Sequence, residues 1–238
     1  MIFLYIILGL ISLFILFVLL TFICSLFVTK EEYNKVNKFY RFLYDVWAVL
    51  AVGASGIRVK VIGKEKIPTD SKFLMVENHI SNFDAIVTGY ALRKFKLAPI
   101  SKPEIFKMFV FGKIIRKCCF LPINREDARA AIETIRKASN LIKNDTASIL
   151  LYPEGTRSKT GELLPFHNGT LKIARNSGVP IVVGVIKGTD KTKKNFPFKR
   201  TLVTLEIIDV VSVDTQSEYT TGELGDYIRN QMLDNLNK

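Results

Sequence analysis

The first 29 residues constrain the fold more than any other part of the chain. They contain no charged side chain, and isoleucine, leucine, phenylalanine and valine dominate them. About 20 such residues are enough for a helix to cross a bilayer. A cleaved signal peptide is the competing interpretation. It would begin with positive residues, have a shorter apolar core and end at a small-residue cleavage site, and the sequence has none of these features. We therefore expect residues 1–29 to form an N-terminal membrane anchor helix.

Basic residues follow the anchor closely, at Lys30, Lys35, Lys38 and Arg41. Because basic flanks favour the cytoplasmic side, we expect a cell-membrane protein whose remaining residues lie in the cytoplasm. The whole chain has 34 Lys and Arg against 22 Asp and Glu, a formal net charge of +12. Such a charge suits an anionic membrane surface or nucleic acid. The anchor favours the membrane, and the sequence has no nucleic-acid-binding signature to support the alternative.

Residues 30–56 form a second segment, which is expected to be helical. From Phe39 to Gly56 it is apolar with aromatic residues interspersed, but Arg41 and Asp45 interrupt it and argue against a second membrane span. Two alternatives remain equally compatible with this pattern. The segment is an interfacial or domain-docking helix with its aromatic rings at headgroup level, or it is a plain core helix.

Residues 57–238 alternate short apolar runs with helical patterns, which predicts an α/β domain. Strands are expected at residues 57–63, 72–77, 97–101, 118–123, 148–152, 180–186 and 202–211. Helices are expected at residues 82–93, 103–113, 127–143, 169–177 and 221–236. This order favours a largely parallel or mixed sheet flanked by helices, with functional residues at the carboxyl ends of the strands.

The three cysteines give no disulfide framework. Cys24 lies in the anchor, and Cys118 and Cys119 are adjacent on an expected strand, where their side chains would point to opposite faces. This usage agrees with a reducing cytosol. The cysteines and the two histidines show no metal-ligand spacing, so no metal site is predicted.

A histidine and an aspartate stand at a catalytically useful spacing after one expected strand. His79 follows the apolar run 73–76, and Asp84 comes five residues later. An Asp one turn into the next helix can accept a hydrogen bond from one ring nitrogen, which leaves the other nitrogen as a general base. The structural alternative is that Asp84 only favours the start of a helix, where a carboxylate suits the dipole.

Two further strand ends carry arginine. Residues 153–158 read Pro-Glu-Gly-Thr-Arg-Ser after an apolar run, and Arg125 ends the expected strand 118–123. Arginine offers a planar fork of donors for a phosphate or a carboxylate, and Gly155 allows a ligand close to the backbone. The structural alternative is a turn closed by an ion pair between Glu154 and Arg157.

Together, and in this order, these segments resemble the glycerolipid acyltransferases, and among them the bacterial 1-acyl-sn-glycerol-3-phosphate acyltransferases. The resemblance spans residues 59–189. The family's first motif, N-H-x-x-x-x-D, is matched by Asn78, His79 and Asp84. Its third, F-P-E-G-T-R-S, is matched by residues 153–158 with tyrosine at position 152 in place of phenylalanine.

The other motifs match less fully. The second, roughly G-x-I-F-I-x-R, is matched at Leu121, Ile123 and Arg125, with Cys119 at the usual glycine and Pro122 at the phenylalanine. The fourth, V-P-I-V-P-V, appears at residues 179–184 without its second proline. Residues 166–169 match F-K-x-G with histidine in place of lysine.

The resemblance implies that residues 57–238 form an acyltransferase catalytic domain. It implies transfer of an acyl group from acyl-CoA or acyl carrier protein, as substrate, to the sn-2 hydroxyl of lysophosphatidic acid, without a bound cofactor. The catalytic residues would be His79 and Asp84. The substrate-binding residues would be Asn78, Arg125, Glu154, Gly155, Thr156 and Arg157, with the two arginines on the acceptor phosphate.

Several alternatives stay open. Another lyso-lipid could be the acceptor, and a non-catalytic protein that binds anionic lipid is the more distant rival, against which the intact first motif argues. Donor type, acyl chain length and oligomeric state are undetermined. The basic run from Lys187 to Lys194 is expected to be a solvated loop, with contact to headgroups or to an anionic acyl donor as the alternative.

Overall fold

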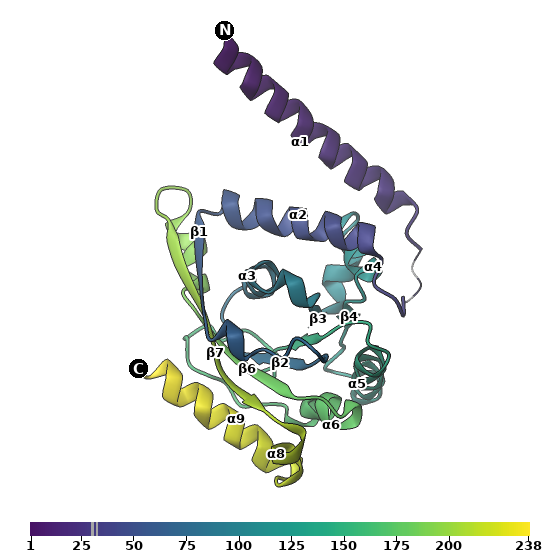
Figure 1. The fold of residues 1–238 in the computed structure, drawn as a ribbon, viewed down its shortest axis with the longest axis vertical. Coiled ribbons are helices and arrows are strands. Elements are labelled where there is room, and N and C mark those ends of the chain that lie inside the picture. Colours follow the sequence, from purple (N-terminus) through teal and green to yellow (C-terminus); the bar gives the residue numbers. More distant parts are fainter. Residues whose placement is uncertain (30, 32) are drawn as a thin grey trace.

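The computed structural model describes residues 1–29, 31 and 33–238 (Figure 1). Lys30, which belongs to the expected basic flank of the anchor, lies outside the described residues. A single long helix, α1 (Ile2–Leu26), extends away from the remainder of the molecule. It is the one helix in the described ranges that is long and apolar enough to cross a membrane, and only 6% of its most apolar window is buried.

Within the described residues, seven strands form one sheet in the order β1-β7-β6-β2-β5-β3-β4. Their bounds are β1 Ile57–Ile62, β2 Leu74–Glu77, β3 Ala98–Ser101, β4 Leu121–Pro122, β5 Ile149–Leu151, β6 Ile181–Lys187 and β7 Thr201–Val211. β6 and β7 pair antiparallel, and the other neighbouring pairs are parallel. The α/β class with a mixed sheet is therefore confirmed.

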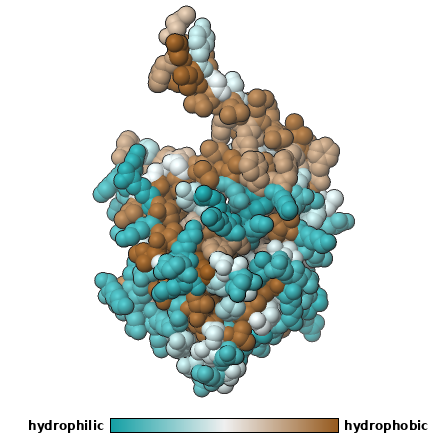
Figure 2. Space-filling model, in the orientation of Figure 1, coloured by the Kyte–Doolittle hydropathy of each residue, from teal (hydrophilic) through white to brown (hydrophobic). Residues whose placement is uncertain are grey.

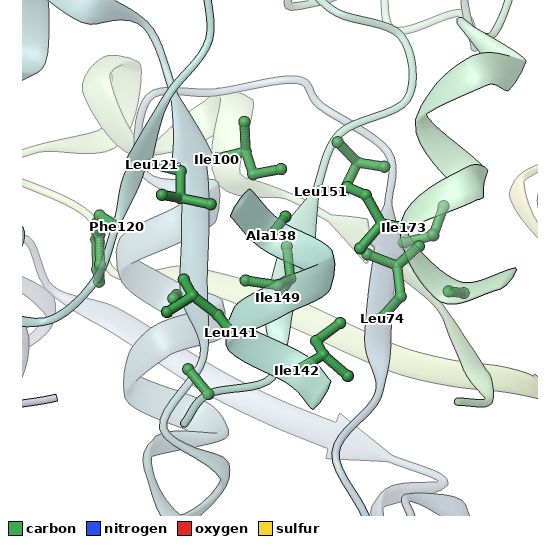
Figure 3. Close-up of a cluster of buried hydrophobic side chains, with 14 of the residues drawn as sticks. Leu74, Ile100, Phe120, Leu121, Ala138, Leu141, Ile142, Ile149, Leu151 and Ile173 are labelled. Atoms are coloured by element: carbon green, nitrogen blue, oxygen red, sulfur yellow. The ribbon is translucent and has the colours of Figure 1, made fainter. Parts of the chain in front are cut away.

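The central strands are apolar on both faces because helices cover both faces. Leu74 and Val76 of β2 face one hydrophobic cluster, and Met75 between them faces the other. Figure 3 shows the first cluster, in which side chains of β2 and β5 meet Leu141 of α5 and Ile173 of α6. These two buried layers hold the strand ends in fixed positions.

The helices lie in two layers (Figure 1). On one side of the sheet are α2 (Lys38–Ala54), α3 (Asp84–Ala91) and α4 (Phe111–Lys117). On the other side are α5 (Ala128–Lys143), α6 (Lys172–Ser177), α8 (Val213–Ser217) and α9 (Thr221–Leu236). Short 3-10 helices occur at η1 Lys64–Lys66, η2 Arg93–Phe95, η3 Pro103–Lys107, η4 Asn168–Leu171 and η5 Thr189–Lys191, and α7 spans Thr192–Asn195.

Helix α2, in the second segment, docks on the domain with one face and leaves its other face exposed. One face is buried against the domain, including Leu43 and Tyr44, whereas Phe42 on the other face is 59% exposed. The last turns of α1 pack on α2, because Phe17 lies against the Trp47 ring and the Tyr40 hydroxyl donates to a carbonyl of α1. Figure 2 shows hydrophobic residues covering α1 and the surface beside it.

The expected strand at residues 118–123 is wrong in its first half. Cys118 ends α4, Cys119 has a φ of 60°, and β4 contains only Leu121 and Pro122. The N–H of Phe120 bonds back to a carbonyl of α4, so the apolar run closes the helix before it enters the sheet. The left-handed conformation explains why glycine suits position 119 in the second motif.

Two other expectations also need correction. Residues 103–113 contain η3 and the start of α4 instead of one helix, because Pro103 and Gly112 lie in separate turns. The basic run from Lys187 to Lys194 is not a simple solvated loop. It forms η5 and α7, and two of its threonines, Thr189 and Thr192, are each only 1% exposed.

Candidate active site

The candidate site lies at the edge of the sheet where parallel strands end. β2, β4, β5 and β6 all run in one direction, so their carboxyl ends share an edge. His79 follows β2, Arg125 follows β4, residues 153–158 follow β5, and Thr189 follows β6. Because β2 lies between β5 and β6, His79 occupies the middle of this edge.

The expected hydrogen bond between His79 and Asp84 is present. His79 Nδ1 lies 2.8 Å from Asp84 Oδ2, the aspartate side chain is fully buried, and the histidine side chain is 18% exposed. The carboxylate faces Nδ1, and Nε2 is the ring nitrogen that this contact leaves free. A histidine held in this way can use Nε2 as a general base.

Asp84 also organises the turn before α3. Its Oδ2 atom accepts the backbone N–H groups of Ile80 and Ser81, each at 2.8 Å. Asp84 therefore has both of the roles considered for it. It lies at the start of the helix, and it contacts His79. The same carboxylate sets both the backbone of the turn and the orientation of the imidazole ring.

Thr189 completes the set of contacts around Asp84, and sequence reasoning missed it. Its buried hydroxyl donates to Asp84 Oδ1, although the two residues are 105 positions apart. Thr189 begins η5 directly after β6. The only sequence signal was its position at the end of a strand expected to share the sheet edge with β2.

The loop after β5 holds the backbone of His79 from both sides. Glu154 Oε1 accepts the His79 N–H at 2.7 Å, and the Ser158 N–H donates to the His79 carbonyl at 2.8 Å. Glu154 Oε2 accepts the Leu164 N–H at 2.9 Å. The Glu154 carboxylate is buried, and this burial raises its pKa. Its oxygens hold the loop and the His79 backbone in place.

Asn78 has a similar bracing contact. Its side-chain nitrogen donates to the Ile186 carbonyl at 3.0 Å, and its side-chain oxygen accepts the Ile186 N–H at 2.7 Å. Asn78 is 2% exposed. The asparagine of the first motif therefore joins the β2 exit to β6.

A second buried polar pair lies behind the histidine. The Glu77 carboxyl is fully buried, and both of its oxygens lie within 3.0 Å of Thr88 Oγ1. Burial, aided by the nearby charge of Asp84, raises the pKa of Glu77 well above its usual range. The Tyr152 ring stacks on the His79 ring at 4.2 Å between centroids. Burial thus disfavours the charged form of Glu77 beside Asp84.

One opening beside His79 is an apolar groove with a cation at its rim, called here the Arg125 groove. It has a volume of about 330 Å³. Its lining consists of Arg125, Tyr152, Pro153, Leu151, Gly155, residues 167–170, Ile100, Ile123 and the α5 residues Ala128, Ala131, Ile132 and Ile135. Gly155 has a φ of +71°, and a β-carbon there would stand 2.6 Å from the His167 ring, so only glycine fits this turn.

The other opening is a basic cleft of about 650 Å³. Five of the residues that line it are basic and one is acidic: Arg157, Lys159, Lys187, Lys191, Lys193 and Asp190. Asn78, Ile80, Ser81 and Thr156 also line it. Arg125 and Arg157, both expected on one phosphate, therefore line different openings.

The two neighbouring cysteines have no place at this edge. Burial raises the pKa of Cys118 to about 12 and that of Cys119 to about 11. Cys119 donates from Sγ to the Tyr33 carbonyl at 3.1 Å. Protonated thiols in this setting are packing residues.

Comparison with known proteins shows which family the chain resembles. Residues 58–187 match a family model described as Acyltransferase. The chain is 28% identical over 182 residues to the 1-acyl-sn-glycerol-3-phosphate acyltransferase of Limnanthes douglasii, covering 76% of this chain and 63% of that protein. It is 33% identical over 156 residues to the chloroplastic 1-acyl-sn-glycerol-3-phosphate acyltransferase BAT2 of Brassica napus, covering 65% and 44%. The chain thus spans between 44% and 63% of the length of these relatives.

A solved structure shares the fold. The crystal structure of the 1-acyl-sn-glycerophosphate (LPA) acyltransferase PlsC from Thermotoga maritima matches with a TM-score of 0.69 and 23% sequence identity, over 92% of this chain and 87% of that chain. The match extends beyond residues 58–187, and therefore includes part of the N-terminal helical region or the C-terminal elements.

Proposed function

Because this chain belongs to the acyltransferase family, we propose that it moves a fatty acyl group from a thioester donor to lysophosphatidic acid. The acceptor is the free sn-2 hydroxyl, and the product is phosphatidic acid. The names of the relatives support this acceptor. The observation that carries the proposal is the His79–Asp84 pair, whose carboxylate is buried while the imidazole remains partly exposed.

The reaction needs one base that later acts as an acid. His79 Nε2 takes the proton from the acceptor hydroxyl, and the oxygen attacks the thioester carbonyl. The carbon–sulfur bond breaks, and His79 returns the proton to the leaving thiolate. Asp84 holds the ring in the required tautomer and stabilises the imidazolium form. The thioester carrier is a substrate, and the proposed mechanism uses no bound cofactor.

The Arg125 groove suits the acceptor. A lyso-lipid has a phosphate and an apolar chain, and this groove combines one guanidinium with an apolar wall formed by α5. An arginine fork binds a phosphate through two parallel hydrogen bonds. We therefore place the apolar chain of the acceptor in this groove and its phosphate at Arg125, with Arg157 of the turn after β5 as the second arginine proposed for the phosphate.

The proposed enzyme is membrane-bound, with its catalytic domain on the cytoplasmic side. α1 is long enough to span a bilayer, and Lys35 and Lys38 follow it. An acceptor and a product that both reside in the bilayer give the anchor a clear purpose. Digestion of the domain by an added protease in inverted membrane vesicles, but not in intact cells, would support this orientation.

The central experiment measures thiol release by the purified full chain. His79→Ala is expected to lower turnover by about 100- to 10,000-fold, the usual loss when a general base is removed. Asp84→Asn should also lower turnover severely, and Asp226→Asn, an exposed change on α9, serves as the matched control. Circular dichroism and membrane partition should be unchanged in each variant. Near-normal turnover of His79→Ala would refute the mechanism.

A panel of acceptors separates the related functions. Lysophosphatidic acid, other lysophospholipids and lyso-aminolipids are offered with acyl-CoA or with acyl carrier protein as donor. Highest turnover with lysophosphatidic acid supports the proposal, and preference for another lyso-lipid replaces the acceptor while keeping the reaction. Lipid binding without thiol release would identify a non-catalytic protein.

A further inference from the structure

We propose that a cleft away from the catalytic site binds the phosphate group of an anionic phospholipid of the bilayer. This cleft, called here the Arg41 cleft, has a volume of about 570 Å³ and is lined by Arg41, Phe42, Lys35, Lys38 and Lys96, among others. The inference goes beyond acyltransfer and does not depend on it. It requires only that the chain lies at a membrane, which agrees with the length and apolar composition of α1.

The Arg41 cleft lies at the edge of the sheet opposite to His79. Lys96 comes just before β3, and residues 144–146, which also line the cleft, come just before β5. Both strands run parallel to β2, and His79 follows the carboxyl end of β2. The amino ends of parallel strands share the edge opposite to their carboxyl ends. A lipid bound in this cleft therefore leaves the catalytic edge free.

Arg41 carries a buried N–H group that lacks an acceptor. The residue is 3% exposed, its Nε pairs with Asp45, and its Nη1 donates to the Leu97 carbonyl. Its Nη2 is buried and has no hydrogen-bond partner among the described residues. A buried donor without an acceptor is unfavourable. An oxygen of a phosphate is a suitable acceptor, since a guanidinium that is already held in place binds phosphate well.

The charge around Arg41 also favours an anion. Lys35, Lys38 and Lys96 are exposed, and in the parts of the chain that the structure describes their side chains form no ion pair or hydrogen bond. The two carboxylates that line the cleft are already paired, Asp45 with Arg41 and Asp145 with Lys72. Three lysines therefore give the opening an unbalanced positive charge, which attracts a negatively charged group.

The position of the cleft and its apolar rim select a lipid over a soluble phosphate. Phe42, which lines the cleft, is 59% exposed. The preceding turn of α2 contacts the end of α1, where the Tyr40 hydroxyl donates to the Cys24 carbonyl at 2.8 Å (Figure 1). The cleft is thus next to the point where the apolar helix ends, which is headgroup level for a helix in the bilayer. Cations at this level attract anionic lipids, and the Phe42 ring offers a contact to their apolar part.

The segments that supply the cations are fixed to one another. The Thr146 hydroxyl donates to the Asn34 carbonyl at 3.2 Å, and the Asn37 N–H donates to the Lys117 carbonyl at 2.9 Å. The Arg41 bond to Leu97 joins α2 to the segment that carries Lys96. The cations therefore come from separate parts of the chain that the fold brings to one opening.

The test measures lipid retention by native mass spectrometry of the purified full chain in detergent micelles. Phosphatidylglycerol is the anionic probe and phosphatidylcholine the neutral one. Lys35→Gln with Lys96→Gln should weaken phosphatidylglycerol binding by about 10-fold or more, the effect of at least one lost charged contact, and should leave phosphatidylcholine binding unchanged. Lys60→Gln with Lys94→Gln is the matched control, because it removes the same charge at exposed positions outside the cleft.

Two further arms identify the site and the source of the phosphate. Arg125→Gln with Arg157→Gln changes the residues proposed for the acceptor, and this chain should retain phosphatidylglycerol as the parent does. Glycerol 3-phosphate, added at the same concentration as the lipid, should not displace it. Arg41 stays unchanged in every arm, because it also joins α2 to the domain.

Four outcomes would overturn the proposal. They are no preference of the parent for phosphatidylglycerol, equal loss in the cleft variant and its control, loss in the Arg125 and Arg157 variant alone, and displacement by glycerol 3-phosphate. The last would identify a soluble phosphate as the ligand. The proposed function fails separately. A parent chain that releases no thiol but retains phosphatidylglycerol through Lys35 and Lys96 would refute acyltransfer and leave the lipid site standing.

Discussion

Asp84 makes most of the hydrogen bonds that hold the catalytic pair in place. One of its oxygens is shared by His79 and two backbone N–H groups, and the other accepts the Thr189 hydroxyl. If the Asp84 carboxylate loses one of its hydrogen-bond donors, it can rotate. The imidazole ring that it orients then loses its alignment. Thr189 is therefore a positioning residue that acts through Asp84.

Replacing Thr189 tests this role. Thr189→Val keeps the shape but removes the hydroxyl, and it should lower kcat by roughly 10-fold, since a hydrogen bond to a charged group contributes about 1.5–3 kcal/mol. Both KM values should change little, and the pH profile of kcat should shift. Thr189→Ser restores the donor and should recover most of the rate. Equal rates for the valine and serine variants would show that the hydroxyl has no such role.

Glu77 makes stability depend on pH in a predictable direction. Its pKa in the folded chain is raised above the ordinary value of 4.5, so folding favours the protonated form. Its contribution is present at low pH and is lost as the pH rises towards the folded-state pKa. Glu77→Gln should therefore gain stability relative to the parent as the pH rises, by up to about 1.4 kcal/mol per pH unit.

Denaturant unfolding in micelles between about pH 5 and about pH 9 measures this difference. Glu65→Gln, an exposed change in η1, provides the control. A constant difference in unfolding free energy across the range would mean that Glu77 is ionised when folded.

The cysteines provide a negative test of covalent catalysis. With thiol pKa values raised by burial to about 12 for Cys118 and about 11 for Cys119, neither forms a reactive thiolate near neutral pH. Single Cys118→Ser and Cys119→Ser variants should keep turnover within a few-fold of the parent, and iodoacetamide should inhibit weakly. Mass spectrometry that finds an acyl group on either sulfur would establish a covalent intermediate and exclude direct transfer.

Local spacing was sufficient to predict some contacts of the site and not others. The contact between His79 and Asp84 follows from five-residue spacing across a strand end, which is short enough for one turn to determine. Thr189 reaches Asp84 only because β6 lies beside β2, and strand order cannot be read from residue spacing. The backbone contacts of Asn78 with β6, and of Glu154 with His79 and Leu164, could not be predicted either, because they join segments that are distant in the sequence or depend on the path of a loop.

At the scale of elements, the apolar runs of the central strands predicted the sheet well. β2, β5 and β6 are buried on both faces, so their composition differs clearly from that of the helices. The strand expected at residues 118–123 was wrong because its composition does not distinguish a strand from a helix end. The end of a buried helix and a buried strand have the same apolar composition. The chain also changes direction at Cys119, and cysteine is not a residue type that indicates a turn in a sequence.

Helix α2 is joined to the domain by a buried cation. Arg41 is 3% exposed, donates from Nη1 to the Leu97 carbonyl at 2.8 Å, and pairs through Nε with Asp45 at 3.1 Å. Arg41→Ala leaves both acceptors without their donor and should destabilise the chain by about 3 kcal/mol, the lower end for a broken buried pair. Arg58→Ala, on the exposed side of β1, should change stability by less than about 0.5 kcal/mol.

Chemical denaturation in micelles measures both variants, and Arg41→Ala with Asp45→Ala isolates the pair. The double variant should lose less stability than the sum of the two single variants. Additive losses would mean that Arg41 contributes through packing and the Leu97 contact, without coupling to the carboxylate.

At the scale of the whole molecule, α1 contains two parts with different contacts. From Phe14 onward it packs on α2 through Trp47, and Phe22 packs on Phe109. Residues 2–13 are exposed throughout. A chain that lacks residues 2–13 keeps every one of these ring contacts, but its remaining helix, residues 14–26, is shorter than the roughly 20 residues needed to span a bilayer.

This truncation distinguishes a spanning helix from an interfacial one. The full chain should stay with membranes after alkaline carbonate extraction, and the truncated chain should be released. At neutral pH the truncated chain should still bind anionic vesicles, because the exposed face of α2 retains Phe39, Phe42 and Val49. Replacing residues 2–13 with leucines should restore resistance to carbonate, and turnover in micelles should match in all three chains. Release of the full chain, or resistance of the truncated one, would mean that α1 lies along the membrane surface beside α2.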